Sequence, residues 1–183
     1  MKTTLSIAVL VLAVACLGND AALEWQRGGA PWRVATCNFA HYNRGHLVWD
    51  LIAFAGLGLA CERRNRPAFH AALAASAIAI PLVVMTCTPL VSYRGLSGIA
   101  AALFALLVTL ERKQWTVLLC AGAFGAKLAF ELYTGNGVFA ADLGPNVVAV
   151  PLAHLAGAVI GVACGLGIMA RPTCVPSSPC SSP

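Results

Sequence analysis

The chain has 183 residues, of which 59% are hydrophobic and only 10% are charged, and its formal net charge is +5. A soluble globular domain carries about a quarter charged residues, so this composition excludes that class. The small positive charge requires no nucleic-acid partner, and the hydrophobic content predicts an all-α integral membrane protein embedded in the lipid bilayer.

The hydrophobic residues fall into six blocks, which we interpret as six spans of a helical bundle. A transmembrane helix needs about 20 such residues to cross a hydrocarbon core about 30 Å thick. The second and fourth blocks are shorter, so their ends are expected in the headgroups, in water or against protein. The predicted spans are residues 5–17, 47–61, 69–86, 96–110, 115–133 and 147–170.

The first block follows Met1 and Lys2, and a second interpretation is a cleaved signal peptide, with Cys16 resembling a lipoprotein cleavage site. Under both interpretations residues 18–43 lie on the far side of the membrane. This segment is rich in aromatic side chains that favour the headgroup layer, so we expect a folded loop on or in the outer leaflet. The aromatic residues are Trp25, Trp32, Phe39 and Tyr42.

Basic residues set the predicted topology, because loops rich in Lys and Arg stay cytoplasmic. We expect both termini on the cytoplasmic side, with residues 1–171 as the membrane domain and residues 172–183 as a disordered Pro/Ser-rich tail. The cytoplasmic set is Lys2, Arg63, Arg64, Arg66, Arg112, Lys113 and Arg171, and the opposite set is Arg27, Arg33, Arg44 and Arg94.

Ionisable side chains inside spans cost a few kcal/mol or more each, so they are functional candidates by default. The second block carries His46 and, four residues later on the same face, Asp50. The fifth carries Lys127 and Glu131, also four apart, which predicts an ion pair; alternatively, Glu131 contacts a polar segment of a substrate.

Ser97 begins the fourth block in the run Gly95-Leu96-Ser97-Gly98, about one turn from the outer surface. Small residues of this kind are often ordinary packing residues in membrane helices. Tyr93 and Arg94 precede the run and are expected to anchor the helix end or contact substrate at the outer mouth.

The sixth block carries His154 followed by Gly157, Gly161 and Gly165, small residues at intervals of four. The fourth block continues from Ser97 with Ala101 and Ala105 at the same interval. Two such faces allow close helix packing, which would bring Ser97 and His154 together. A serine hydroxyl needs an adjacent base, so this pairing predicts a Ser–His dyad; the alternative for His154 is a structural hydrogen bond.

No metal or cofactor site is predicted, because the four histidines lack ligand spacing with Cys or Glu and no HExxH motif occurs. His41 and His70 are interpreted as interfacial residues. The eight cysteines are read mostly as packing residues, and a disulfide between Cys37 and Cys87 is left open.

The Gly-Leu-Ser-Gly run, followed two spans later by His154-x-x-Gly157-x-x-x-Gly161, is similar to the rhomboid intramembrane proteases. Tyr93 and Arg94 before this run, and Lys127, Glu131, Thr134 and Gly135 in KLAFELYTG, resemble the rhombosortase branch.

The resemblance implies a six-helix rhomboid-like bundle and a serine endopeptidase in the bacterial inner membrane, opening to the periplasm. Its implied substrates are exported proteins that end in a Gly-Gly motif, a single transmembrane helix and a basic tail. Glycine weakens helix, so such a site can be presented to Ser97 in extended form.

Rhomboids commonly place a histidine and, four residues later, an asparagine near the oxyanion; here Asp50 follows His46. A protonated Asp50 could donate a hydrogen bond there, whereas an ionised one would oppose catalysis. Backbone N–H groups around Gly95, Leu96 and Ser97 are further candidates for the oxyanion hole. Alternative functions are an inactive rhomboid-like protein that binds membrane helices and a small transporter.

Overall fold

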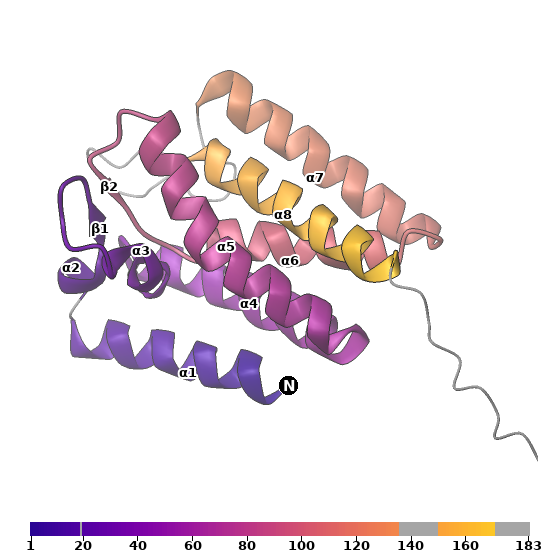
Figure 1. The fold of residues 1–183 in the computed structure, drawn as a ribbon, viewed down its shortest axis with the longest axis horizontal. Coiled ribbons are helices and arrows are strands. Elements are labelled where there is room, and N and C mark those ends of the chain that lie inside the picture. The colour runs from indigo at the N-terminus through magenta and orange to yellow at the C-terminus, as the bar shows by residue number, and fades with distance from the viewer. Residues whose placement is uncertain (19, 136–149, 171–183) are drawn as a thin grey trace, which may run out of the picture.

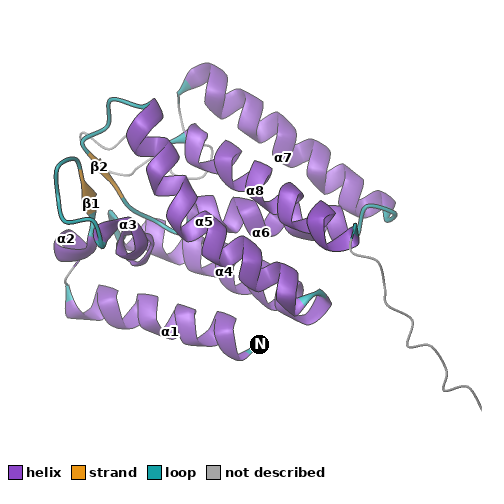
Figure 2. Cartoon of the chain, viewed as in Figure 1, coloured by secondary structure: helices purple, strands orange, loops and turns teal. Residues whose placement is uncertain are grey.

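The computed structural model describes residues 1–18, 20–135 and 150–170 as a bundle of helices with one short pair of strands (Figures 1 and 2). Each predicted hydrophobic block lies largely in a helix, whereas the predicted tail at 172–183 lies outside the described residues. The elements are α1 (Lys2–Leu17), α2 (Asp20–Leu23), β1 (Trp25–Gln26), α3 (Arg33–Thr36), the 3₁₀ helix η1 (Cys37–Phe39), α4 (Arg44–Arg64), α5 (Arg66–Cys87), β2 (Ser92–Tyr93), α6 (Ser97–Leu110), α7 (Trp115–Thr134) and α8 (Pro151–Met169).

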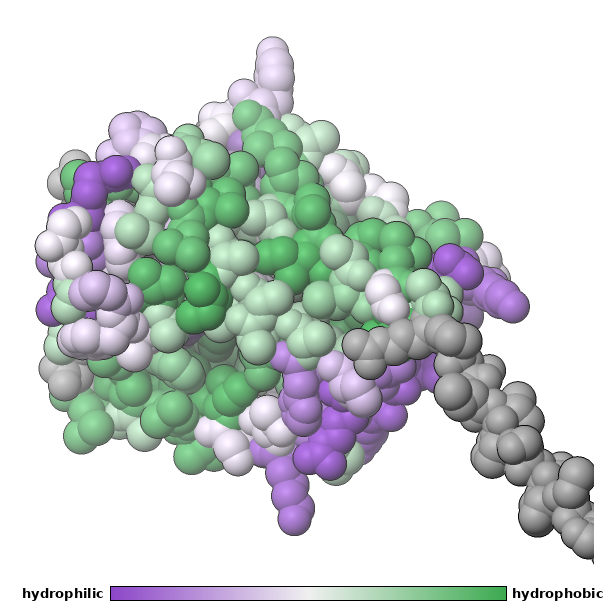
Figure 3. All heavy atoms as spheres, in the orientation of Figure 1, coloured by the Kyte–Doolittle hydropathy of each residue, from purple (hydrophilic) through white to green (hydrophobic). Residues whose placement is uncertain are grey.

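Within the described residues, four helices, α4, α5, α7 and α8, are long and apolar enough to cross a membrane, and α1 and α6 are shorter apolar helices. The count of six spans therefore stays a prediction. Figure 3 shows apolar surface over the middle of the bundle and hydrophilic residues near its two ends. Large apolar side chains such as Val9, Ile52 and Val159 point outward and are more than half exposed. This all-α bundle is apolar outside as well as inside, as lipid requires.

Asparagine side chains cap the first turns of α4 and α5. The side chain of Asn43 accepts the N–H of His46 at 2.8 Å, and that of Asn65 accepts the N–H of Ala68 at 3.0 Å. Asn65 ends α4 and begins α5, which makes the reversal between them tight. Gly135 ends α7 in the left-handed conformation that glycine favours.

Helix α6 is the centre of the bundle and packs most extensively against α8, with further contacts to α4 and α5. Helix α7 lies at the side, and it is the least buried of the four long helices. The main core contains Val11, Phe54, Cys61, Ala68, Phe69, Ala72, Leu96, Ile99, Leu103 and Leu106.

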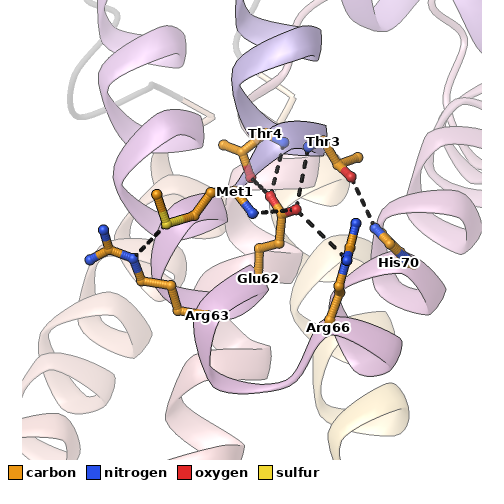
Figure 4. Close-up of polar contacts among 7 residues, drawn as sticks. All are labelled: Met1, Thr3, Thr4, Glu62, Arg63, Arg66 and His70. Atoms are coloured by element: carbon orange, nitrogen blue, oxygen red, sulfur yellow. Dashed lines mark hydrogen bonds and ion pairs between the residues drawn. The ribbon is translucent and has the colours of Figure 1, made fainter.

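Helix α1 is docked onto α4 through a buried carboxylate (Figure 4). Glu62 accepts the N–H of Thr3 at 3.3 Å and both the N–H and the hydroxyl of Thr4, at 3.1 and 2.8 Å. Thr4 is fully buried against Gly58, where an added Cβ would lie 2.7 Å from the threonine methyl. These contacts pack α1 against α4 as part of the bundle.

The loop at 18–43 is folded, as expected, and pairs with the segment that leads to α6. Strands β1 and β2 are antiparallel, with Trp25 opposite Tyr93. Trp25 is 2% exposed and belongs to a second core cluster, whereas Trp32 is 53% exposed, so of these two tryptophans only Trp32 lies at the surface of the loop. The guanidinium of Arg27 fixes the loop by donating to three carbonyls around the end of α5, those of Met85, Thr88 and Leu90.

Candidate active site

The candidate nucleophile, Ser97, is the half-buried first residue of α6 and lies two residues after a glycine with a positive φ. Gly95 has φ +122°, a conformation that side-chain-bearing residues rarely adopt. Its N–H donates to the carbonyl oxygen of Cys37 at 3.1 Å, and a Cβ at this position would lie 2.8 Å from Cε1 of His46. Gly95 therefore provides both the turn before Ser97 and the close approach of His46.

Backbone N–H groups are available beside Ser97 because α6 begins there. The first hydrogen bond of the helix runs from the N–H of Ala100 to the carbonyl oxygen of Leu96, at 2.9 Å. The N–H groups of Ser97 and Gly98 precede it and point out of the helix start. The N–H of Leu96 donates instead to Oδ2 of Asp50 at 2.8 Å. An oxyanion next to Ser97 can therefore use the N–H of Ser97 itself.

Asp50 is the centre of a buried polar cluster on α4. Its Oδ2 lies 3.3 Å from Nε2 of His46 and 3.3 Å from Nε2 of His41. Asp50 is thus a hydrogen-bond acceptor for the segment before Ser97, a role that the sequence did not suggest. The predicted auxiliary residues, His46, Asp50, Gly95 and Leu96, all converge here.

The interfacial interpretation of His41 is wrong, because its side chain is only 4% exposed and lies against Asp50. Its backbone N–H donates to Oδ1 of Asp20 at 2.9 Å, which holds the loop over α4. A loop histidine has no periodicity that could have predicted this position. His70, by contrast, is exposed and lies 3.1 Å from the hydroxyl of Thr3 at the other end of the bundle.

The predicted close packing between the fourth and sixth blocks occurs between α6 and α8, with a different face of α6. A Cβ at Gly157 would overlap the carbonyl oxygen of Gly98, and one at Gly161 would overlap that of Ala102. A Cβ at Gly165 would lie 2.7 Å from the methyl of Thr109. The predicted stripe through Ala101 and Ala105 is therefore displaced by one residue at this interface.

This packing sets the position of Ser97 relative to His154 along the axes of the two helices. A Cβ on Gly98 would lie 3.2 Å from the carbonyl oxygen of Ala153, so the residues adjacent to Ser97 and His154 are in contact. Within the described part of the chain, no hydrogen bond joins the Ser97 hydroxyl to the His154 ring. The two side chains lie at the same end of a tight helix pair.

His154 also meets a carboxylate from a third helix. Nδ1 of His154 lies 2.9 Å from Oε2 of Glu131 on α7, and the other carboxylate oxygen accepts a hydrogen bond from Nζ of Lys127 at 2.8 Å. The predicted Lys127–Glu131 ion pair is confirmed. Glu131 is 1% exposed, so it does not face solvent as a substrate contact would. Figure 1 shows that α7 ends and α8 begins at the same end of the bundle.

Tyr93 and Arg94 anchor the approach to α6. Tyr93 is 3% exposed within the second core cluster, and burial raises the pKa of its hydroxyl well above the ordinary value. The guanidinium of Arg94 stacks on the ring of Tyr42 at 4.3 Å and lies 3.7 Å from Glu24. These positions favour the anchoring alternative over contact with substrate.

The remaining candidates contribute no further chemistry at the site. Cys37 and Cys87 are both free thiols, so the disulfide left open by the sequence is not formed. Burial raises the pKa of the Cys37 thiol to about 12. Residues 1–18, 20–135 and 150–170 contain no group of three His, Cys, Asp or Glu side chains that could hold a metal ion.

Comparison with known families gives one match, to a model described as Rhomboid domain, over residues 28–171. No curated protein matches the chain. The match covers more than half of the chain and includes the helices that carry Ser97, Glu131 and His154. The chain is therefore a multi-pass membrane protein that belongs to the rhomboid family of intramembrane serine proteases.

Proposed function

We propose that this chain is a serine endopeptidase in which Ser97 is the nucleophile and His154 is its general base. The packing of α6 on α8 carries the proposal, because it puts Gly98 against Ala153 and so sets the two side chains at one level. The Ser97 hydroxyl would give its proton to His154 while its Oγ bonds to the scissile carbonyl carbon. General base catalysis of this kind contributes about 10²–10⁴-fold.

The remaining steps use the start of α6. The N–H of Ser97 would stabilise the tetrahedral oxyanion. His46 would support this site indirectly, because its Nε2 faces Asp50 and its Nδ1 accepts the N–H of Tyr42. When the intermediate collapses, the carbon–nitrogen bond breaks and His154 returns the proton to the leaving amine. Water then attacks the carbonyl carbon of the acyl-serine while His154 takes a proton from it. The bond from that carbon to Oγ of Ser97 breaks, His154 returns the proton to Oγ, and the new carboxylate is released.

We propose that the substrates are exported proteins anchored by a single transmembrane helix, with a Gly-Gly motif before that helix and a basic tail after it. The resemblance of the residues around Ser97 and Glu131 to rhombosortases supports this class. Glycine weakens helix, so a Gly-Gly segment can enter a site at the end of α6 in extended form. The proposed location is a bacterial inner membrane with cytoplasmic termini and a periplasmic active site.

The test is cleavage of a reporter that ends in Gly-Gly, a transmembrane helix and a basic tail, coexpressed with wild type, Ser97→Ala or His154→Ala. Ser76→Ala and His70→Ala are matched controls, because Ser76 bonds only carbonyls of its own helix and His70 lies at the opposite end. We expect product with wild type and both controls only. A Val-Val reporter should remain uncut.

Two results would change the assignment. If Ser97→Ala and His154→Ala cut as well as wild type, the dyad is wrong. If no variant cuts while the reporter co-purifies with wild type, the chain is a rhomboid-like protein that binds membrane helices without cleaving them.

A further inference from the structure

The described polar residues near His154 include one buried carboxylate that the dyad does not use. Glu131 comes from α7, and its Oε2 lies 2.9 Å from Nδ1 of His154. In a Ser–His dyad, the nitrogen that receives the serine proton is the one that faces the serine. The contact with Glu131 engages Nδ1 and leaves Nε2 as the nitrogen that the proposed dyad would use.

We propose that Glu131 is a positioning residue that completes a Ser97–His154–Glu131 arrangement, an inference that rests on the proposed function. An ionised carboxylate can only accept a hydrogen bond, so its partner Nδ1 must carry the proton. The lone pair of His154 then lies on Nε2, where it can accept the proton of Ser97. The carboxylate thus selects the tautomer and fixes the ring.

Lys127 supports this role of Glu131 by placing a positive charge next to the buried carboxylate. Its Nζ donates to Oε1 of Glu131 at 2.8 Å, one turn before Glu131 on the same helix. A buried carboxylate is stable only when a partner charge or hydrogen bonds replace water. With one oxygen toward Lys127 and the other toward His154, the carboxylate is held in the orientation that the imidazole needs.

The position of Glu131 on α7 makes this arrangement depend on three helices. Ser97 comes from α6, His154 from α8 and Glu131 from α7. Helix α7 packs much less extensively on α8 than α6 does. The contact between Glu131 and His154 is therefore a polar link that joins α7 to the catalytic pair.

The experiment measures kcat and KM of the full-length protein in detergent, with the Gly-Gly reporter, for wild type, Glu131→Gln, Glu131→Asp and Glu62→Gln. Glutamine can donate to Nδ1 and so stabilise the tautomer that cannot accept the serine proton. We expect Glu131→Gln to lower kcat at least about 100-fold and leave KM within about twofold. Glu131→Asp, which keeps the charge, should be more active than Glu131→Gln.

Glu62→Gln is the matched control, because Glu62 is an equally buried carboxylate at the opposite end of the bundle. It should lower thermal stability and leave kcat per folded enzyme within about twofold of wild type. A fluorophosphonate labels Ser97 without any recognition of the substrate, so its labelling rate reports the reactivity of the serine. This rate should fall in Glu131→Gln and should not fall in Glu62→Gln.

Three outcomes would overturn the inference: an unchanged kcat in Glu131→Gln, a raised KM with unchanged kcat, or a glutamine variant at least as active as the aspartate variant. The second would make Glu131 a substrate contact instead. Ser97→Ala and His154→Ala separate the two proposals. If they are inactive while Glu131→Gln is fully active, the dyad stands without Glu131; if they are active, the proposed function itself fails.

Discussion

A single methyl group at Gly161 should separate α6 from α8 and so weaken both the fold and the proposed catalysis. A Cβ at this position overlaps the carbonyl oxygen of Ala102 and lies 2.9 Å from both the carbonyl carbon of Ala102 and the N of Leu106. Ordinary contacts begin at 3.4 Å. All three neighbours are backbone atoms that cannot rotate away, so the helices must move apart.

The expected loss of stability in Gly161→Ala follows from comparison with a glycine on the same helix. Gly167→Ala meets nothing within 4 Å, so it should gain the helix propensity of alanine, about 1 kcal/mol, without a clash. The same propensity gain applies to Gly161→Ala, so the difference between the two variants isolates the overlap. Overpacking costs about 1–3 kcal/mol, which for a chain of this size corresponds to about 2–12 °C in Tm.

The assay is thermal unfolding in detergent, followed by reporter cleavage at a temperature where both variants are folded. Gly161 is one turn beyond Gly157 and does not lie beside Ser97. Loss of activity in Gly161→Ala would therefore report the spacing of the helices, and a displacement near 1 Å costs about 100-fold. If Gly161→Ala melts and cleaves like Gly167→Ala, the close α6–α8 packing is not required.

Three further predictions concern Gly95, Asp50 and the thiols of Cys37 and Cys87. Gly95→Ala should destabilise the protein by about 1–3 kcal/mol and abolish cleavage, because it combines a positive φ with contact against an imidazole. Asp50→Asn should retain or increase cleavage, since an amide oxygen can still accept the N–H of Leu96. Asp50→Ala should leave that N–H unpaired, which should lower the free energy of unfolding by about 1–3 kcal/mol and abolish activity. A maleimide at pH 8 should label exposed Cys87 but not Cys37, because a thiol pKa of about 12 leaves roughly one thiolate in 10⁴ at that pH.

Each of these has a control. Gly28→Ala has a positive φ but no neighbour within 4 Å, so it should cost less than Gly95→Ala, and equal losses would remove the steric part of the argument. An inactive Asp50→Asn would contradict a role based on accepting a hydrogen bond. Labelling of Cys37 in the folded protein at the rate seen in denaturant would contradict its burial.

The sequence alone determined the class of protein, the location of its helices and the identity of the main candidate residues. Long continuous hydrophobic blocks form helices in lipid, because a helix satisfies all of its backbone hydrogen bonds within one segment. The spacing of four between Lys127 and Glu131 predicted their ion pair, since such residues are neighbours on any α-helix. The glycine stripe after His154 predicted close helix packing for the same local reason.

Only the tertiary structure decided which groups meet between elements. The face of α6 that receives Gly157 contains Gly98 and Ala102, one residue from the predicted stripe, because both faces are lined by small residues and their spacing does not fix the rotation of a helix. His41 lies in a loop, where no periodicity constrains it, and reaches Asp50 only through the fold of residues 18–43. The contact between Glu131 and His154 spans 23 positions and two helices, so it depends on how α7 docks beside α8.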